Sequence, residues 1–418
     1  MLTSKAIIDQ TLNHIQPERL PIDFGGTNTT GIHVSCVAGL REHFGLEPRP
    51  VKVYEPSQML GWLDDDLKDA IGVDVEQVRP GKTSFGFPTR DWKEWRMPDG
   101  LLVLVPGQFN TTTDDEGNIY MHPQGDLTAP PCAKMPNDGY FFDAIIRQPS
   151  IDEDNLNPQD NLEEFQPISD AAVEEIKRTA SGARQTGRAV SASLGGTSLG
   201  DIARVPGPAL KHPKGIRDIS EWYMSIATRP EYIRAIFEAQ CGIALDNLTK
   251  IAAATSDTID VVYICGTDFG TQSGTFCSRK TFQSLWAPYY KQINNWVHQN
   301  TNWKTFKHSC GSVIKFLDDF IECGFDIYNP VQCSAANMNA QELKQRFGDR
   351  ITFWGGGVDT QKTLPFGTPA EVREEVLQRC EIFAPGGGFV FNTVHNIQAR
   401  TPVENIVAML NALHEFNG

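Results

Sequence analysis

The sequence lacks any long apolar run. No stretch approaches the roughly 20 consecutive apolar residues that a helix needs to cross a bilayer. Residues 1–21, MLTSKAIIDQTLNHIQPERLP, also lack the apolar core and the small-residue cleavage site of a signal peptide. They are instead typical of a short amphipathic helix that ends before Pro17. These two absences predict a cytoplasmic protein with no membrane partner.

Clustered positive charge and clustered cysteine are also absent. Lys and Arg number 37 against 52 Asp and Glu, which gives a formal net charge of −15. Without a local basic cluster, this charge excludes a nucleic-acid partner and disfavours a strongly polyanionic substrate. The nine cysteines are spread over 418 residues, without the density of a disulfide framework. Most are expected to be small buried hydrophobic residues, and Cys310 is the exception because of its neighbours.

From about residue 168 onward, short β-branched or aromatic runs alternate with amphipathic helical patterns. This alternation is typical of parallel strands covered by helices. With one run near the start, seven strands are predicted, at residues 19–26, 189–196, 258–268, 303–311, 324–332, 351–359 and 388–396. Seven candidate strands and an inferred eighth favour a (β/α)8 barrel of the TIM type. A doubly wound parallel sheet is the alternative.

Residues 85–150 differ from the rest of the chain, which is otherwise predicted to form a single domain over residues 1–418. Short apolar or aromatic runs alternate there with the turn sequences PDG, DEG and NDG. The pattern predicts an antiparallel β insertion in the N-terminal half of the barrel. We expect this insertion, with Trp92 and Trp95, either to cover the barrel as a lid or to form the contact of a homodimer.

Polar side chains follow nearly every predicted strand. In a (β/α)8 barrel the chemistry lies at the carboxyl ends of the strands, on the loops that lead to the helices. The residues at these ends are Asp23, Asp268, His308, Cys310, Asn329, Gln332, Asp359, His395 and Asn396. The pattern therefore predicts an active-site face.

The HSCG sequence at residues 308–311 is the first candidate site. Residues i and i+2 of an extended chain face the same way, so His308 and Cys310 can direct an imidazole nitrogen and a thiolate to one point. Both groups are ligands suited to zinc. His395, at another predicted strand end, would complete a three-ligand site with an open fourth position, as a catalytic zinc requires. The alternative is a buried cysteine beside histidines that bond to the backbone.

Two further strand ends supply candidate catalytic and substrate-binding residues. The loop GTDFGTQSG (266–274) lacks a phosphate-binding glycine pattern, and Asp268 within it would repel phosphate. We interpret this loop as a turn that presents Asp268 and Gln272 to substrate. The loop GGGVDTQ (355–361) places Asp359 on the same face, and capping of the next helix is an equal alternative for this residue.

Asp359, Glu374 and His395 form an acid–acid–His series along the sequence. Glu374 lies in a helical pattern whose buried stripe consists of Val372, Val376 and Cys380. At about 100° per residue, Glu374 falls roughly opposite that stripe and faces solvent, which makes it a poor metal ligand. We therefore prefer His308, Cys310 and His395, and the choice between His395 and an acidic residue such as Glu374 stays open.

The chain resembles the uroporphyrinogen decarboxylase-like superfamily, in its corrinoid-dependent methyltransferase branch. RLPIDFGGTNTTGIH resembles the first strand and loop of that branch, and residues 53–78 resemble the helical stretch after it. GTDFGTQSG, HSCG, YNPVQ, GGGVDTQKTLPFGTP and HNIQARTPVENI resemble its successive barrel motifs. The resemblance covers most of the chain and is weakest over residues 85–165. It implies a (β/α)8 barrel fold.

Relatives in this branch transfer methyl groups between a substrate and the cobalt of a separate corrinoid protein. Their metal motif is His-x-Cys with a distant Cys on a late strand. The first two positions match His308 and Cys310, and His395 takes the place of the distant Cys. The resemblance implies a zinc ion at these residues. Histidine in place of the distant cysteine lowers the thiolate character of the site and raises the effective charge on the metal, which suits a Lewis-acid role on an ether or hydroxyl oxygen better than thiol activation. Related O-demethylases use acid–acid–His zinc motifs, to which the series through Asp359 and Glu374 corresponds.

These observations predict a zinc-dependent methyltransferase that moves a methyl group from a small O-methyl or N-methyl donor to a corrinoid protein. Asp268 or Asp359 would move protons. The residues expected to bind the substrate are His33, Gln272, Asn329 and Gln332.

The corrinoid is expected on a partner protein. Apart from HSCG at residues 308–311, the His-x-x-Gly sequences of the chain begin at His122 and His212. Tyr120 and Leu210 stand where the corrinoid-binding motif has its Asp. Neither sequence therefore matches the motif, and cobalamin should arrive bound to a separate protein.

Three other functions are weighed against this one. Resembling decarboxylases grip a porphyrinogen with an Arg-rich N-terminal motif, whereas residues 23–36, DFGGTNTTGIHVSC, contain no arginine. A uroporphyrinogen decarboxylase-like lyase, or a zinc-dependent hydrolase that needs no corrinoid, is the alternative function. A non-enzymatic binding barrel is disfavoured by the polar strand ends.

Overall fold

A curled parallel sheet forms the centre of the molecule. The computed structural model describes residues 2–79, 81–194 and 196–418, so Gly195 of the predicted strand 189–196 lies outside the described residues. The sheet has seven strands in the order β16-β15-β14-β13-β12-β11-β4. They are β4 (Val75–Val78), β11 (Ala189–Ser193), β12 (Val261–Cys265), β13 (Lys304–His308), β14 (Ile327–Asn329), β15 (Thr352–Trp354) and β16 (Phe389–Val390). Neighbouring strands follow one another in sequence and pair in parallel. This order excludes a doubly wound sheet, in which the strand order reverses.

The segment around Ile22 joins the two edges of this sheet. Ile22 forms a parallel bridge with Phe391, and the Asp23 N–H donates to the Phe391 carbonyl at 2.9 Å. On the other edge, the N–H of Asp74, just before β4, donates to the Ile22 carbonyl at 2.8 Å. These bonds complete a TIM-like barrel, as the alternation of strands and helices predicts. Ile22 lies in the predicted strand 19–26, and β4 is the strand whose place the sequence left undetermined.

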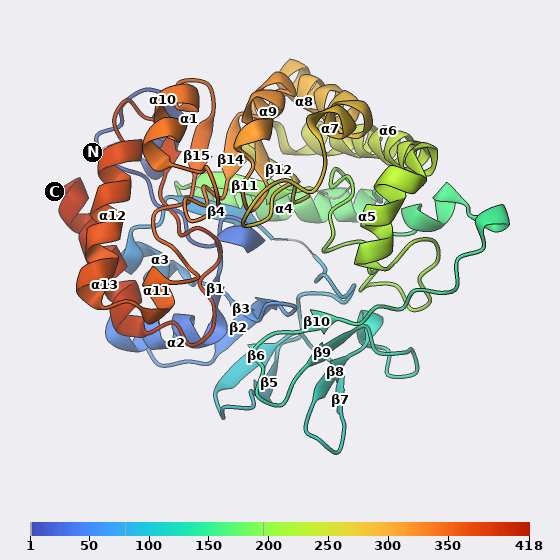
Figure 1. Ribbon diagram of the computed structural model, residues 1–418. Coiled ribbons are helices and arrows are strands. Elements are labelled where there is room, and N and C mark those ends of the chain that lie inside the picture. The colour runs from blue at the N-terminus through green and yellow to red at the C-terminus, as the bar shows by residue number, and fades with distance from the viewer. Residues whose placement is uncertain (1, 80, 195) are drawn as a thin grey trace.

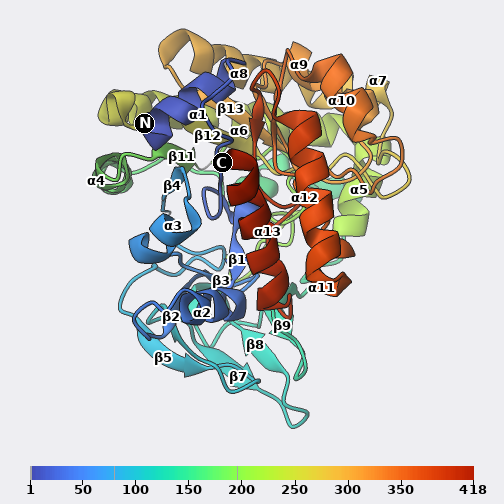
Figure 2. The same cartoon turned by 90° about the vertical axis from the view of Figure 1, so that its left-hand side faces the viewer.

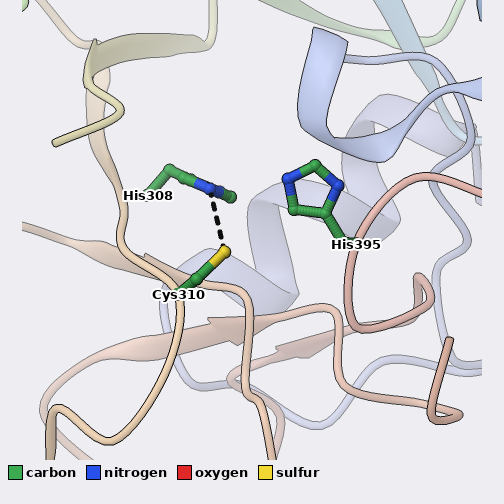
Figure 3. A group of neighbouring side chains, drawn as sticks. All are labelled: His308, Cys310 and His395. Atoms are coloured by element: carbon green, nitrogen blue, oxygen red, sulfur yellow. Dashed lines mark hydrogen bonds between the residues drawn. The ribbon is translucent and has the colours of Figure 1, made fainter. Parts of the chain in front are cut away.

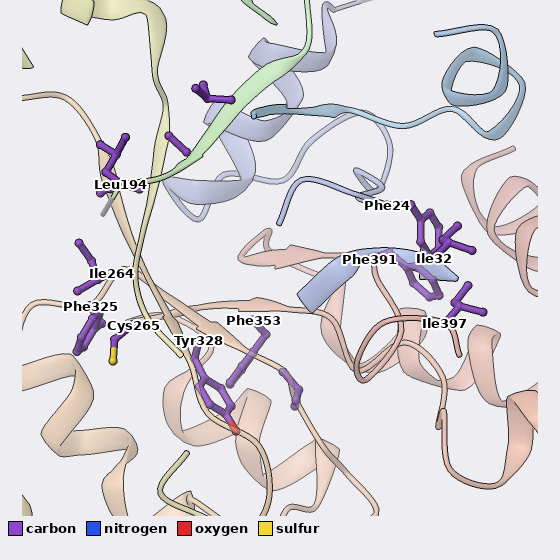
Figure 4. Packing of buried hydrophobic residues seen from close by; sticks show 14 of the residues in the cluster. Phe24, Ile32, Leu194, Ile264, Cys265, Phe325, Tyr328, Phe353, Phe391 and Ile397 are labelled. Atoms are coloured by element: carbon purple, nitrogen blue, oxygen red, sulfur yellow. The ribbon is translucent and has the colours of Figure 1, made fainter. Parts of the chain in front are cut away.

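Apolar side chains pack where the first and last parts of the barrel meet. Figure 4 shows Phe24, Ile32, Phe391 and Ile397 gathered together, and all four are buried. Ile32 also forms a parallel bridge with Ile397. This packing holds the loop after Ile22 against the loop after β16, which carries His395.

The amino end of the barrel is filled by apolar side chains. Helix α1 (Ser4–Leu12) places Ile8 and Leu12 in one buried cluster with an apolar residue from each of the seven strands. These strand residues are Val75, Ala189, Val261, Phe306, Ile327, Trp354 and Val390. Because this layer closes the amino end, the site lies at the carboxyl end.

Helices surround the barrel and bury one apolar stripe each. In α12, a capping box between Thr368 and Glu371 starts the helix, and Val372, Val376 and Cys380 form its buried stripe. Helices α12 and α13 lie side by side (Figure 2). None of the helices among the described residues is long and apolar enough to cross a membrane. The helices after α1 are α2 (Val34–His43), α3 (Asp65–Ile71), α4 (Asp170–Gln185), α5 (Ile219–Thr228), α6 (Pro230–Thr255), α7 (Arg279–Leu285), α8 (Ala287–Asn300), α9 (Leu317–Glu322), α10 (Ala340–Phe347), α11 (Thr363–Phe366), α12 (Pro369–Phe383) and α13 (Val403–Asn417).

Two smaller sheets lie beyond the barrel, in the lower part of Figure 1. One has five strands in the order β1-β3-β2-β6-β5, and the other is antiparallel with the order β10-β9-β8-β7. Their strands are β1 (Ile32–His33), β2 (Val51–Glu55), β3 (Leu60–Gly61), β5 (Lys93–Arg96), β6 (Leu102–Val105), β7 (Thr111–Thr113), β8 (Ile119–Met121), β9 (Ala133–Met135) and β10 (Asp143–Ala144).

The helical stretch expected over residues 53–78 is wrong. The structure has only one helix there, α3, between strands β3 and β4. The β-branched Val51 and Val53 belong to β2, which pairs with β3 and β6. Gly72 then ends α3 in the left-handed conformation at φ 83°. The chain can therefore enter the barrel as β4 directly after a short helix.

Candidate metal centre

The side chains of His308, Cys310 and His395 converge at the carboxyl end of the barrel (Figure 3). His308 is the last residue of β13, Cys310 follows two residues later, and His395 lies on the loop after β16. One ligand atom of each lies within 4.8 Å of the others, and His308 Nε2 is 3.4 Å from Cys310 Sγ. Zinc bonds of about 2.0 Å to nitrogen and about 2.3 Å to sulfur separate tetrahedral ligand atoms by roughly 3–4 Å. The three side chains therefore fit one zinc ion with little movement.

The turn after Cys310 depends on glycine. Gly311 has φ +83°, and a Cβ at this position would lie 2.5 Å from the backbone carbon of Gly270. The Gly311 N–H donates to Gln332 Oε1 at 2.7 Å, and the Ser312 N–H donates to the Thr271 carbonyl at 2.8 Å. This close approach of two loops fixes the backbone that carries Cys310.

Each histidine is held on its far side by an asparagine. Asn329 Oδ1 is 2.6 Å from His308 Nδ1, and Asn329 Nδ2 donates to the Trp354 carbonyl at 2.7 Å. The donor end of this amide is thus occupied, so its oxygen accepts from a protonated His308 Nδ1. Asn396 Oδ1 lies 2.5 Å from His395 Nδ1 in the same way. Both rings therefore keep the Nε2 lone pair, as metal-binding histidines with an outer hydrogen-bond partner do.

Burial makes the two imidazoles neutral. The pKa of His308 lies well below its ordinary value because of desolvation and the nearby His395, and burial also lowers the pKa of His395. The pKa of Cys310 is raised well above its ordinary value by burial and by the Asp268 carboxylate. Neutral imidazoles are ready ligands, and a bound cation is what favours the thiolate of a cysteine in such surroundings.

Asp268 is the carboxylate next to this group. Its Oδ1 accepts a hydrogen bond from the Cys310 N–H at 2.7 Å and lies 3.9 Å from His308 Nε2. Burial raises the pKa of Asp268. The residue precedes the loop that contacts Gly311, so the same backbone approach positions Asp268 and Cys310.

A cavity of about 440 Å³ opens beside the three converging side chains. This volume lies within the usual range for small-molecule sites. His308, His395 and Asp268 line one part of it, and Tyr263 contributes a ring. Further polar and apolar lining residues are Thr27, Asn28, Thr29, Gln58, Ser84, Ser193, Ser198, Ile202, Pro206, Pro208 and Ile219. Three carboxylates and one guanidinium also line the cavity, from Glu55, Asp201, Asp268 and Arg204.

Residues 85–144, here called the β cover, form part of the cavity wall. Phe85, Ala133, Phe142 and Ala144 all line the cavity. The rings of Phe85 and Phe142 pack edge to face with centroids 6.2 Å apart. The β cover thus forms part of the cavity wall, and both the lid and the homodimer contact stay predictions.

Comparisons with known proteins show what the chain is similar to. A sequence model of the uroporphyrinogen decarboxylase (URO-D) family matches residues 212–416. Over this region the chain is similar to the uroporphyrinogen decarboxylase family. The matched region contains β12 to β16 and all three converging side chains.

Two curated uroporphyrinogen decarboxylases illustrate the sequence similarity. The protein from Pseudoalteromonas translucida is 35% identical over 80 residues, which cover 19% of this chain and 22% of that protein. The protein from Psychromonas ingrahamii is 34% identical over 74 residues, covering 18% and 20%. The chain thus spans only about a fifth of the length of the curated relatives it matches.

A solved structure shares the whole fold. A methyltransferase from Methanosarcina mazei superposes with a TM-score of 0.55 at 15% identity, with 100% of both chains covered. At this identity, the likeness concerns the fold. It supports the TIM-like barrel over the full length of the chain.

The residues predicted to bind substrate have protein partners in the structure. His33 is buried, with Nδ1 2.7 Å from Ser35 Oγ and Nε2 3.0 Å from the Tyr140 carbonyl. Gln332 holds Gly311, and Asn329 holds His308. Gln272 is exposed, and its Nε2 donates to Gln361 Oε1 at 3.0 Å. Asn329 and Gln332 therefore hold residues of the HSCG segment, whereas His33 and Gln272 bond to residues outside the converging group.

Of the two predicted proton-transfer residues, only Asp268 lines the cavity. Asp359 Oδ1 accepts from the backbone N–H groups of Gln361 and Lys362, both at 2.7 Å. These bonds close the turn before α11, whose N-cap is Lys362 without a side-chain cap bond, so the predicted capping of that helix by Asp359 is not seen. Glu374 is exposed on α12 and lies outside the converging group, in agreement with its predicted position opposite the buried stripe.

Several cavity residues were not found from the sequence. Glu55 is the last residue of β2 and Gln58 follows that strand, while Asp201 and Arg204 lie on the long loop after β11. Of these, only Asp201 and Arg204 carried a signal, since they follow a predicted strand and its turn.

Proposed function

We propose that this protein transfers a methyl group from a small O-methyl or N-methyl donor to a corrinoid protein, with zinc held by His308, Cys310 and His395. The observation that carries the proposal is the convergence of two neutral imidazoles and one thiol beside a cavity of about 440 Å³. Three protein ligands leave a fourth tetrahedral position for a substrate atom, which distinguishes catalytic from structural zinc.

The donor set suits zinc. Imidazole and thiolate together favour this borderline-soft ion, whereas magnesium and calcium prefer oxygen ligands. When bound, zinc supplies a Lewis acid that polarises the leaving oxygen or nitrogen and lowers its pKa. A His–Cys–His set with a single thiolate keeps more positive charge on the metal than a two-thiolate set, which favours an ether or hydroxyl oxygen as its ligand.

In this proposal, residues of the chain bind the metal, orient the metal-binding imidazoles and protonate the leaving group. Asn329 and Asn396 hold the two imidazoles with Nε2 toward the metal position. Asp268, on the cavity wall 3.9 Å from His308 Nε2, is positioned to hold a proton for the leaving group. Phe85 and Phe142 of the β cover separate the reacting atoms from bulk water.

The charges on the cavity wall limit the substrate class. Glu55, Asp201 and Asp268 contribute three carboxylates, against the single guanidinium of Arg204. A polycarboxylate such as a porphyrinogen requires several cations, and the N-terminal loop offers Thr and Asn side chains instead. A uroporphyrinogen decarboxylase-like lyase therefore ranks below methyl transfer, although the curated relatives carry that name.

The corrinoid would arrive on a separate protein that docks at the carboxyl end of the barrel. The cavity opens at this end, and the fold is shared with a methyltransferase from Methanosarcina mazei. We place the methyl acceptor on that partner because Tyr120 and Leu210 stand where the corrinoid-binding motif has its Asp.

Metal analysis tests the core of the proposal. Purified protein should contain about one zinc per chain, and His308→Ala and Cys310→Ser should each lose it. The buried Cys380→Ser variant, on α12, serves as a control that should keep its zinc. Retention of stoichiometric zinc by both site variants would overturn the metal assignment.

An assay of methyl transfer separates the two zinc functions. Free cob(I)alamin is followed by its absorption change while methoxylated aromatics and methylamines are screened as donors. Zinc-dependent methylcobalamin formation supports the proposal. Release of methanol or amine without any methylcobalamin points instead to a zinc-dependent hydrolase.

A further inference from the structure

Gln58, which lies outside the barrel strands, contacts the asparagine that holds a histidine of the proposed metal site. We propose that Gln58 is a positioning residue, which fixes the ring of His395 through Asn396 and links the β cover to the metal site. The inference rests on the zinc site proposed above. It concerns how that site is assembled, and it holds for any donor.

The hydrogen bonds around Asn396 determine the tautomer of His395. Gln58 Oε1 accepts from Asn396 Nδ2 at 2.6 Å, and the Asn28 carbonyl accepts from the same nitrogen over a longer 3.4 Å, so the oxygen of Asn396 faces the other way. That oxygen lies 2.5 Å from His395 Nδ1 and also accepts from Gln398 Nε2 at 2.6 Å. Because an amide oxygen can only accept, His395 carries its proton on Nδ1 and keeps the lone pair on Nε2. A reversed amide at Gln58 would reverse Asn396 and place the proton on Nε2, where it would block metal binding.

The turn that carries Gln58 is itself tied to the β cover. Glu55, at the end of β2, accepts from the Gln58 N–H at 2.9 Å and from the hydroxyls of Ser57 and Ser84 at 2.7 Å each. The carbonyl of Ser57 accepts from the Phe142 N–H at 2.7 Å. The side chain of Glu55 is buried. The cover and the Gln58 turn therefore form one hydrogen-bonded unit.

The two histidines differ in what holds them. His308 is held by Asn329 of β14, which bonds to the carbonyl of Trp354 in β15 and also accepts from the Thr29 hydroxyl at 3.3 Å, so residues of the barrel and of its first loop fix it. His395 is held through Asn396 and Gln58, which belongs to the smaller sheets. Loss of the Gln58 contact should therefore free one of three ligands. The metal site is expected to weaken and change geometry while His308 and Cys310 still bind.

Cobalt(II) provides a spectroscopic probe of this role. It occupies zinc sites, and its visible absorption depends on ligand geometry. Gln58→Met keeps the side-chain length but removes the acceptor, whereas Gln58→Glu keeps an acceptor for Asn396 Nδ2. The methionine variant should bind cobalt and zinc about 10- to 100-fold more weakly, with an altered cobalt spectrum. The glutamate variant should restore both the affinity and the spectrum to near those of the unchanged protein.

A matched control separates positioning from general loosening. Gln240 is buried and donates to the carbonyls of Gly196 and Ser198 at 3.1 and 3.2 Å, away from the metal ligands. Gln240→Met removes buried amide hydrogen bonds as well, yet it should leave the cobalt spectrum unchanged. Thermal unfolding of the metal-free proteins checks that each variant folds. Gln58→Asn, which retracts the same amide, replaces Gln58→Met if the latter does not fold.

Each outcome decides one claim. If the unchanged protein binds neither cobalt nor zinc, the proposed metal site is overturned and the role of Gln58 with it. If the unchanged protein binds both, and a folded Gln58→Met or Gln58→Asn variant keeps its affinity and spectrum, the role of Gln58 alone is overturned.

Discussion

The two ends of the barrel are built from the same strands and opposite kinds of side chain. At the amino end, Ile8 and Leu12 of α1 complete an apolar layer with Phe306 and other strand residues. At the carboxyl end, His308 lies only two residues further along β13 and faces a cavity. A step of two residues along one strand thus leads from the stabilising apolar layer to the residues that face the cavity. The comparison teaches that stability and reactivity are carried by different layers, as in other barrels of this type.

The largest effect on stability is expected at the closed end. Ile8→Ala removes a fully buried side chain from the apolar layer and should lower the free energy of unfolding by about 2–5 kcal/mol. Ile15→Ala, at a side chain that is 55% exposed, should change it by less than about 0.5 kcal/mol. Urea denaturation measures both. An altered cobalt spectrum in the folded Ile8→Ala variant would contradict the separation between the apolar layer and the cavity layer.

A substitution at the carboxyl end of the barrel should weaken zinc binding and leave the free energy of unfolding nearly unchanged. Cys310→Ser should weaken zinc binding by at least about 100-fold, more than the loss of an outer partner does. The unfolding free energy of the metal-free protein should stay within about 1 kcal/mol. Cys380→Ser should do the opposite, since it buries a hydroxyl in the apolar stripe of α12 and leaves the metal untouched. Chelator competition measures the zinc affinity, and urea denaturation measures the free energy of unfolding.

Asp23 lies at the boundary between the two layers and should make stability depend on pH. Burial raises its pKa to about 6, partly offset by bonds from Trp354 Nε1 and the Gly26 N–H and by the charge of Lys68. Below about pH 4 the residue is protonated in both states. Between about pH 4 and 6 only the unfolded state loses the proton, so stability falls by about 2–3 kcal/mol as pH rises and is constant above that range.

Replacement of Asp23 isolates this contribution. Asp23→Asn should remove the fall in stability between pH 4 and 6 when metal-free protein is denatured with urea at several pH values. Asp349→Asn, at a side chain that is 84% exposed, should leave the pH profile unchanged. An unaltered profile in Asp23→Asn would show that Asp23 does not titrate in this range.

Replacing one glycine at each end of the barrel tests the local backbone geometry, with smaller expected changes in the free energy of unfolding. Gly386, near the closed end, has φ +79°, and no atom lies within 4 Å of the position that a Cβ would take there. Gly386→Ala should therefore cost only the left-handed backbone, about 1–2 kcal/mol. Gly311 has the same handedness and a close backbone neighbour, so Gly311→Ala should cost more and also weaken metal binding. Equal costs in denaturation, with metal affinity unchanged, would contradict the tight loop approach.

The sequence predicted the parts of the molecule that follow from local periodicity. Alternation of apolar runs and helical stripes indicated the barrel, and the i, i+2 spacing indicated that His308 and Cys310 point the same way. Strand β4 was not located from the sequence because its Glu76 and Gln77 are polar. Glu76 is buried with three cations near its carboxylate, Lys68 at 2.6 Å, Arg188 at 3.6 Å and Arg79 at 3.8 Å. A residue pattern of this kind does not indicate a buried strand.

The candidate site was predictable only in part, for a physical reason. His395 was placed by its position after a predicted strand and by the family resemblance. Glu55 and Gln58 reach the cavity only because the smaller sheets fold over the barrel, so no spacing along the chain indicates them. Asn329 and Gln332 were predicted as substrate ligands because an amide at a strand end can bind a ligand or a neighbouring loop equally well.

The bridge between Ile22 and Phe391 has a consequence for the order in which the molecule forms. The first segment of the ring pairs with a residue near the far end of the chain. During synthesis, the emerging strands can stack on one another in sequence, but the ring has an open edge until residue 391 has left the ribosome. His395 follows that residue by only a few positions. The last ligand of the proposed metal site is therefore made after almost all of its scaffold, and the ring and the proposed site become complete at nearly the same point of synthesis.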